Sequence, residues 1–365
     1  MPKRIFFTVT NDLTYDQRMN RICSSLAANG YDVVLVGRKL PSSLPLQPAQ
    51  YKQKRIRCFF KKGKMFYAEY NFRLLFYLLF KKIDAVCAID LDTILPCLYI
   101  SRWKKIPRVY DAHELFTGLK EVATRPHVLK TWSRIEKKAV PKYKAGYTVS
   151  QSIAVEFSKR YDVKYETIRN VPVLYDLPVV PVTAEKFILY QGAVNEARGF
   201  ETLIPAMKWV KARLIICGDG NFMPQLKELI RQNGVEGRVE LKGMMSPESL
   251  RSFSPTAYIA VAVPENTGIN QYLALPNKFF DYLHAGLPQV TVNYPEYVRL
   301  NNQYEVAVLL DNLAPERIAA ALNNLMEDTV LFNKLKQNCL KARQELHWGI
   351  EEKKLISFYQ SLFTS

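Results

Sequence analysis

The sequence predicts an α/β protein built from two Rossmann-like domains, each with a parallel sheet between helices. Short apolar runs alternate with helical patterns along the chain, and this alternation is typical of parallel sheets with helical crossovers. The alternation restarts after a proline-rich stretch at residues 170–182, which indicates a linker. The length of 365 residues also exceeds what one ordinary core accommodates.

The first half contains five apolar runs with the length and composition of buried strands. A helix is predicted over residues 18–29, because its apolar residues recur on one helical face and Gly30 follows it. The expected strands are 4–10, 32–37, 85–90, 108–113 and 145–150.

The second half repeats the pattern, with helices expected at 200–210, 224–233 and 276–285. The expected strands are 186–192, 213–220, 239–243, 257–263, 288–293 and 306–310. We place the first domain at residues 1–175 and the second at 183–345, with a terminal helix in 346–365.

The helix at 276–285 begins with Pro276 and carries Lys278 in its first turn. A cation there is disfavoured by roughly 0.3–1 kcal/mol, because the unpaired N–H groups already make this end positive. One explanation is an i,i+3 pair with Asp281. The other is an anion that docks at the helix end and uses both Lys278 and the N–H groups.

The net charge of +17 lies entirely in the first half. Residues 1–170 hold 32 Lys and Arg against 14 Asp and Glu, whereas residues 171–365 hold 19 against 20. This asymmetry favours an anionic partner for the first half, such as a phosphate-bearing substrate, an acidic membrane surface or nucleic acid.

Other features indicate a cytoplasmic protein. The six cysteines lie at least ten residues apart without zinc spacing, so we expect reduced thiols. The N-terminus lacks a signal-peptide pattern. The apolar run at residues 74–80 is far shorter than the ~20 residues that span a bilayer.

Residues 51–82 interleave Lys and Arg with Phe and Tyr. One interpretation is a buried helix with a solvated charged edge. The other is an interfacial surface that contacts anionic lipid. Nucleic acid is a weaker alternative, because no recognition module is visible.

Three segments contain candidate site residues besides Lys278. His113 follows a strand and stands between Asp111 and Glu114, although a lone histidine is commonly a core residue. Arg198 precedes a helix and has the forked donors that grip phosphate, unless it is an ordinary loop arginine. The turn at 218–220 lets a backbone approach a flat ligand but lacks the third glycine of the dinucleotide fingerprint.

The order of these segments resembles the retaining GT-B glycosyltransferases of the family 4 type, which build bacterial surface polysaccharides. The resemblance covers nearly the whole chain and rests on "VYDAHEL", "GAVNEARGFETLI", "LIICGDGN" and "LPNKFFDYLHAGLPQV". It implies two Rossmann-like domains whose parallel sheets face each other across a cleft. It further implies that the first domain binds acceptor, the second binds nucleotide sugar, and the terminal helix packs back toward the first domain.

The resemblance also implies residue roles. The catalytic candidates are His113, Glu114 and Asp12. The donor diphosphate candidates are Arg198, Lys278 and Asn277. The nucleotide candidates are Gly192, Gly218, Gly220 and Asp281, and the acceptor-side candidates are Asn11 and Asp16. No metal ligand is assigned, because the two cations and the helix end take the place of magnesium.

Three departures from the family pattern leave alternatives open. Leu273 stands where the family often has a first acid, Ala193 replaces a common basic residue, and the glycine-rich first loop is absent. A catalytically weak subunit that partners another glycosyltransferase, or a nucleotide-sugar epimerase on the same fold, therefore remains an alternative.

The expected function is sugar transfer from a nucleotide diphosphate sugar to a saccharide or lipid-linked saccharide, with retention, in cell-surface polysaccharide assembly. We expect no cofactor, no metal requirement and no nucleic-acid partner. The protein is expected in the cytoplasm, peripheral at the inner face of the cell membrane through residues 51–82.

Overall fold

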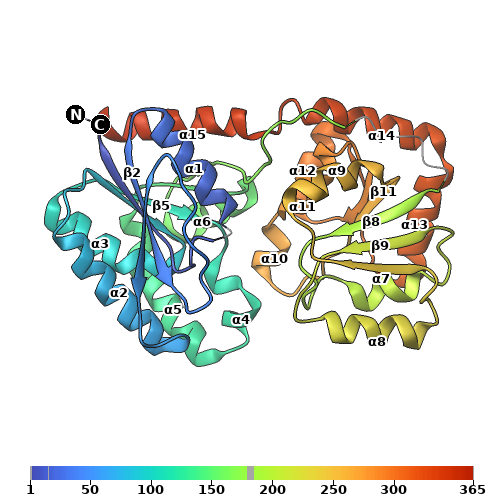
Figure 1. The fold of residues 1–365 in the computed structure, drawn as a ribbon, viewed down its shortest axis with the longest axis horizontal. Helices are drawn as coiled ribbons and strands as arrows, with labels where there is room; N and C mark the ends of the chain where they lie inside the picture. The colour runs from blue at the N-terminus through green and yellow to red at the C-terminus, as the bar shows by residue number, and fades with distance from the viewer. Residues whose placement is uncertain (1, 15, 179–184, 365) are drawn as a thin grey trace. The chain divides into compact units, whose positions relative to one another are not determined.

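The computed structural model describes residues 2–14, 16–178 and 185–364 and divides into two compact units. Unit 1 comprises residues 1–170 and 351–365, and unit 2 comprises residues 171–350. Each unit contains one parallel sheet, so the predicted α/β class is confirmed (Figure 1). The expected start of the second domain, residue 183, lies outside the described residues.

Unit 1 contains a seven-stranded sheet in the order β3-β2-β1-β4-β5-β6-β7. The strands are β1 (Arg4–Thr8), β2 (Asp32–Lys39), β3 (Lys52–Arg57), β4 (Ala85–Ile89), β5 (Arg108–Ala112), β6 (Ala145–Thr148) and β7 (Glu166–Thr167). The α-helices are α1 (Gln17–Ala28), α2 (Gly63–Leu79), α3 (Ile94–Lys104), α4 (Lys120–Ala123), α5 (Pro126–Ala139) and α6 (Gln151–Tyr161).

The terminal helix α15 (Trp348–Thr364) belongs to unit 1 from Glu351 onward. Its Tyr359 is buried, with its ring 5.9 Å from that of Phe7 on β1. Glu351 pairs with Arg169 at 3.1 Å. The chain end thus completes the core of the unit that the chain start begins.

Unit 2 contains a six-stranded sheet in the order β10-β9-β8-β11-β12-β13. The strands are β8 (Phe187–Gln191), β9 (Arg213–Cys217), β10 (Val239–Gly243), β11 (Ile259–Ala262), β12 (Gln289–Val292) and β13 (Ala307–Leu310). The α-helices are α7 (Phe200–Ala206), α8 (Met223–Asn233), α9 (Pro247–Phe253), α10 (Ile269–Leu273), α11 (Asn277–His284), α12 (Pro295–Tyr304), α13 (Pro315–Glu327) and α14 (Thr329–Ala342).

Successive residues of the unit 2 strands enter different cores, as the two-residue period of a strand requires. Ile188 and Tyr190 of β8 join one apolar cluster, whereas Phe187 and Leu189 join another. Both faces of the sheet are therefore covered, which explains why its strands are near-continuous apolar runs.

Two sequence expectations about element bounds were wrong. The helix expected at 200–210 ends at Ala206, because Pro205 donates no backbone hydrogen bond and the following N–H groups bond three residues back. The segment 51–82 is not one helix but an edge strand, β3, followed by α2. Only Ile56 of β3 is buried, so this strand lacks the apolar signal that identified the others.

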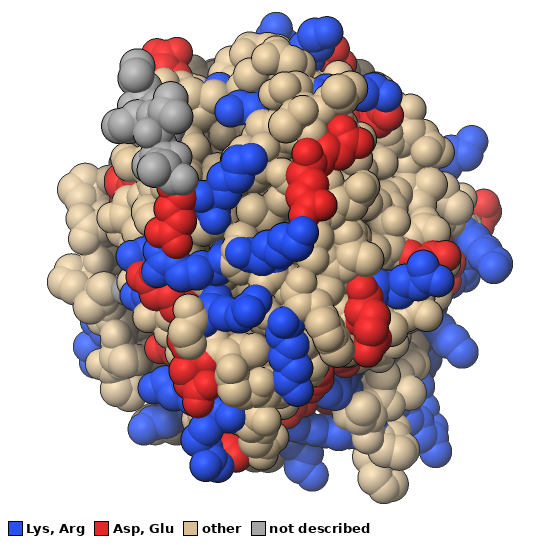
Figure 2. Space-filling model, turned by 90° about the vertical axis from the view of Figure 1, so that its right-hand side faces the viewer, with Lys and Arg blue, Asp and Glu red and all other residues tan. Residues whose placement is uncertain are grey.

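Charge is mixed on the face of unit 2 that Figure 2 shows, where Lys and Arg are interspersed with Asp and Glu. This agrees with the near balance of charges in residues 171–365. None of the helices in the described residues combines the length and apolar composition that crossing a membrane requires.

Candidate functional site

Lys278 lies in the first turn of α11, at a helix start without a side-chain cap. Pro276 occupies the N-cap position, so no capping side chain shields the positive end of the helix dipole. Phe279, Phe280 and Leu283 are buried and fix the helix in the core of unit 2. The helix thus holds its N-terminus and Lys278 rigidly.

Lys278 lies beside the end of β8, within electrostatic reach of Arg198. Lys278 Nζ lies 3.8 Å from the ring centre of Tyr190, and a Cβ added to Gly192 would stand 3.4 Å from it. Burial lowers the pKa of Lys278 well below its ordinary value, Arg198 lowers it further, and Asp281 opposes them. The ion pairs found among the described residues include none for Lys278 or Arg198. Burial and Arg198 disfavour the charged form of Lys278 in the free chain, and a bound anion would favour that form.

Three candidate glycines pack backbone against backbone. A Cβ on Gly218 would lie 1.9 Å from the carbonyl oxygen of Gly192, and one on Gly220 would lie 2.2 Å from that of Val194. Hydrogen bonds join the same loops, from Gly192 N to the Cys217 oxygen at 2.9 Å. The glycines thus let the loops after β8 and β9 lie against each other.

Gln191 orients the carboxylate of Asp281, and the sequence analysis did not identify it. Its Nε2 donates to Asp281 Oδ2 at 3.2 Å, while its Oε1 accepts from Ser254 Oγ at 2.7 Å. Gln191 is buried at the end of β8, and in the sequence it was interpreted only as a residue of that strand. Asn277, the other candidate on α11, is exposed in the first turn.

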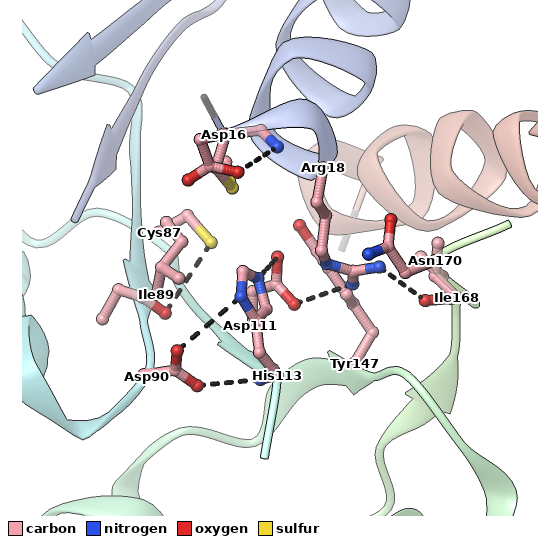
Figure 3. A network of polar contacts seen from close by, with 12 residues as sticks. Asp16, Arg18, Cys87, Ile89, Asp90, Asp111, His113, Tyr147, Ile168 and Asn170 are labelled. Atoms are coloured by element: carbon pink, nitrogen blue, oxygen red, sulfur yellow. Dashed lines mark hydrogen bonds and ion pairs between the residues drawn. The ribbon is translucent and has the colours of Figure 1, made fainter. Parts of the chain in front are cut away.

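In unit 1, His113 lies between two aspartates (Figure 3). Its Nε2 is 3.1 Å from Asp111 Oδ2, and its Nδ1 is 3.7 Å from Asp90 Oδ2. Its backbone N–H also donates to Asp90 Oδ1 at 2.8 Å. Glu114 follows this histidine in the sequence, and the carboxylate that faces the second ring nitrogen is that of Asp90.

A buried ion pair with Arg18 holds the aspartate that contacts this histidine. Arg18 donates to Asp111 Oδ1 at 2.9 Å and to the Ile168 carbonyl at 3.0 Å, and the Arg18 and Asp111 side chains are almost fully buried. The charges of Arg18 and His113 lower the pKa of Asp111 although burial acts to raise it. Asp111 is therefore a fixed negative charge for His113.

The negative charges of Asp111 and Asp90 keep His113 protonated. Burial acts to lower its pKa, but Asp111 and Asp90 outweigh it and raise the pKa to about 9. Burial raises the pKa of Asp90 to about 7, with His113 opposing and Glu114 adding to the rise. Asp90 also has a positive φ of 53°, a conformation that is strained for a residue with a side chain. The network is thus held in place against local strain.

The first strand–helix loop holds the remaining candidates, whose side chains stabilise the loop itself. Asp16 caps α1 by accepting from Met19 N at 2.9 Å and also accepts from Asn11 at 2.6 Å. Asp12 accepts from Thr14 N at 3.1 Å and from Ser43 Oγ at 2.9 Å. These contacts give Asn11, Asp12 and Asp16 a structural role, and their catalytic and acceptor roles stay predictions.

Across residues 2–14, 16–178 and 185–364, no three His, Cys, Asp or Glu side chains gather in a metal-binding arrangement. The basic side chains of unit 2 suit an anionic ligand, and the charged histidine of unit 1 suits an anionic or hydroxyl-bearing one.

Two family models match the chain. The model for Glycosyltransferase Family 4 matches residues 17–177, and the model for Glycosyl transferases group 1 matches residues 179–360. An uncharacterized glycosyltransferase of Methanocaldococcus jannaschii is 25% identical over 183 residues, 48% of this chain and 45% of that protein. The chain therefore matches less than half of this curated relative's length.

Solved structures share the fold along the whole chain. Sucrose-phosphate synthase from Thermosynechococcus elongatus has a TM-score of 0.82 at 16% identity and covers 99% of both chains. Anabaena HepE in complex with UDP and glucose has a TM-score of 0.74 at 14% identity and covers 98% of this chain and 100% of its own. These likenesses establish the fold, and the two family models assign each unit, so the chain belongs to the GT-B glycosyltransferases, with a family 4 domain followed by a group 1 domain.

Proposed function

We propose that the chain transfers a sugar from a nucleoside diphosphate sugar to a saccharide or lipid-linked saccharide. The proposal rests on Lys278 and Arg198, two cations without an ion pair among the described residues, at the uncapped start of α11. When the bond to the donor sugar breaks, negative charge develops on the diphosphate. Preorganised cations and helix N–H groups stabilise such charge strongly in a water-poor site.

His113 serves as a fixed positive charge in this proposal and not as a base. Its pKa of about 9 keeps it protonated at neutral pH, with an aspartate at each ring nitrogen. The departing diphosphate oxygen takes the proton of the acceptor hydroxyl, whose oxygen bonds to the anomeric carbon with retention. Retention and a role in surface polysaccharide assembly rest on the family resemblance, and Asp12 and Glu114 remain catalytic candidates on the same ground.

The donor site needs no metal in this proposal, because Lys278, Arg198 and the helix end supply the positive charge. EDTA should therefore leave turnover unchanged. UDP-sugars are the first donors to test, since the structural neighbour HepE was solved with UDP and glucose. Asn277, Asp281, Gly192, Gly218 and Gly220 are proposed to surround the nucleotide.

We also propose that the protein is cytoplasmic and that unit 1 makes a peripheral contact with the anionic inner face of the cell membrane. Helix α2 buries Phe66, Tyr70, Leu74 and Leu78 and leaves aromatic residues on its outer face. Helix α3 packs beside it, with Lys104 Nζ bonded to the Lys81 carbonyl at 3.0 Å (Figure 1). The exposed aromatic residues of the two helices are Phe72, Phe76, Tyr99 and Trp103, and the exposed Phe80 directly follows α2.

Aromatic rings among lysines suit a headgroup boundary, where rings insert and cations attract anionic lipid. Phe72, Phe76 and Phe80 are 70%, 59% and 70% exposed, so replacing all three with serine leaves the core untouched. We expect the protein to sediment with anionic vesicles at physiological salt and the triple variant to lose most of this binding. If both proteins sedimented equally with the vesicles, or if neither did, the proposed membrane contact would be wrong.

A binding subunit without turnover is the second candidate, and the departures at Ala193 and Leu273 favour it. Measuring nucleoside diphosphate release from UDP-, GDP- and ADP-hexoses by the isolated chain separates the two. We expect release from one class, at least tenfold slower in Lys278→Ala. The exposed Lys208 provides the control, and Lys208→Ala should retain full turnover. Nucleotide binding without release would favour the subunit.

A further inference from the structure

A groove of about 310 Å³ lies at the ends of two neighbouring strands of unit 1, apart from the residues assigned above. Strands β2 and β3 pair in parallel with Lys39 opposite Arg57, so their last residues reach the same edge of the sheet. Parallel sheets place ligands at this carboxyl edge. The basic side chains that line the groove are Arg38, Lys39, Arg57 and Lys61. All lining residues lie in the described part of the chain, and none is Asp or Glu.

The nearby carboxylate of Glu69 holds the loop at one side of the groove and is not among the residues that line it. Glu69, on α2, accepts from Phe59 N at 2.9 Å and from Phe60 N at 3.0 Å. It also accepts from Arg73 Nε at 2.7 Å. Both carboxylate oxygens are therefore engaged, and the loop that carries Lys61 is pinned to α2.

Arg38 is held in place before any ligand arrives. Its guanidinium carbon lies 4.5 Å from the ring centre of Phe66, which is buried, and one terminal nitrogen donates to the Lys61 carbonyl at 3.2 Å. Its Nε is buried without a hydrogen-bond partner among the described residues. A fixed arginine with unused donors is suited to the planar recognition of phosphate.

The groove adjoins the edge that carries the rest of the unit 1 site. Arg38 N donates to the Asn11 carbonyl at 2.8 Å, which ties the groove to the first strand–helix loop. Asp92, next to this loop, accepts from Thr10 Oγ1 at 2.7 Å and does not line the groove. Burial raises the pKa of Asp92 and Arg38 lowers it, so this carboxylate acts on the groove from outside its lining. The lining itself has four basic side chains and no carboxylate.

We propose that this groove binds the phosphate of the acceptor, either a phosphate monoester or a diphosphate that joins the saccharide to its carrier. This inference rests on the proposed function, and it specifies an anionic acceptor for the same reaction. A neutral saccharide would supply no counter-charge to the four basic side chains that line the groove. The donor diphosphate has its own cations, Lys278 and Arg198, in unit 2.

Pyrophosphate binding tests the groove directly. Arg57 and Lys61 are exposed, so Arg57→Ala with Lys61→Ala should fold normally. The matched control is Lys54→Ala with Lys62→Ala, which removes the same charge from exposed positions outside the groove. Both pairs are placed in a Lys278→Ala background, so that the donor site does not capture the probe. Calorimetry should show pyrophosphate binding weakened about tenfold or more by the groove pair alone.

Competition identifies the source of the phosphate. Glucose 1-phosphate should displace pyrophosphate if the acceptor is soluble, whereas phosphatidic acid vesicles should displace it if the acceptor is lipid-linked. Equal pyrophosphate affinity in the groove and control pairs would overturn the proposal. This result is independent of nucleotide binding, so a chain that binds no nucleotide contradicts the proposed function while the groove comparison still stands.

Discussion

Replacing His113 with glutamine should remove a pH-dependent part of the stability of unit 1. Asp111 and Asp90 raise the pKa of His113 from 6.5 to about 9, against the effect of burial. One pKa unit corresponds to about 1.4 kcal/mol, so the protonated ring contributes about 3 kcal/mol. Because the folded pKa is the higher one, this contribution is complete below pH 6.5 and is lost as the pH rises through about 9.

Urea unfolding of both proteins across this pH range measures the contribution. The difference in unfolding free energy should be about 3 kcal/mol larger below pH 6.5 than above about pH 9. His127 is exposed on α5, so His127→Gln is the control and should not change the profile. The imidazole resonances of His113 should titrate near pH 9. A midpoint near 6.5, or a difference independent of pH, would refute the electrostatic account.

Two further substitutions test the backbone packing of unit 2 and the buried ion pair of unit 1. Gly218→Ala places a Cβ 1.9 Å from the Gly192 carbonyl and should cost more than about 2 kcal/mol in thermal unfolding of unit 2. Gly237→Ala, where the Cβ meets nothing within 4 Å, should change stability by less than about 0.5 kcal/mol. Arg18→Leu removes one of the two charged partners of buried Asp111, the other being His113, and should cost about 3 kcal/mol in urea unfolding. Equal costs for the two glycines, or no cost for Arg18→Leu, would contradict these arguments.

Most strands could be predicted from the sequence because both sheet faces are covered and the runs are apolar. β3 could not be predicted, because it is an edge strand with one buried residue and so has no apolar run. Its conformation depends on its pairing with β2. The length of α7 was overestimated because the apolar pattern continues past Pro205 while the hydrogen bonds do not. Burial patterns can thus be predicted from a sequence, whereas the hydrogen bonds that form an edge strand or end a helix cannot be predicted as readily.

The candidate site divides in the same way. Lys278 was predicted because its place in the first turn of a helix conflicts with the helix dipole. Asp90 was read only as a strand end, since its approach to His113 depends on β4 lying beside β5. Arg18 was missed because its partner Asp111 lies 93 positions away in the sequence, and the other buried residues of its helix are mostly apolar. Contacts set by strand order leave no local signal.

The central claim is that the start of α11 is a diphosphate site, and nucleotide binding tests it most directly. We would titrate UDP, GDP, ADP and CMP into the wild-type chain and into Lys278→Ala by calorimetry. The account predicts that one nucleoside diphosphate binds and that the substitution weakens its affinity about tenfold or more. Equal affinity for both proteins, or no binding of any nucleotide to the wild type, would contradict it.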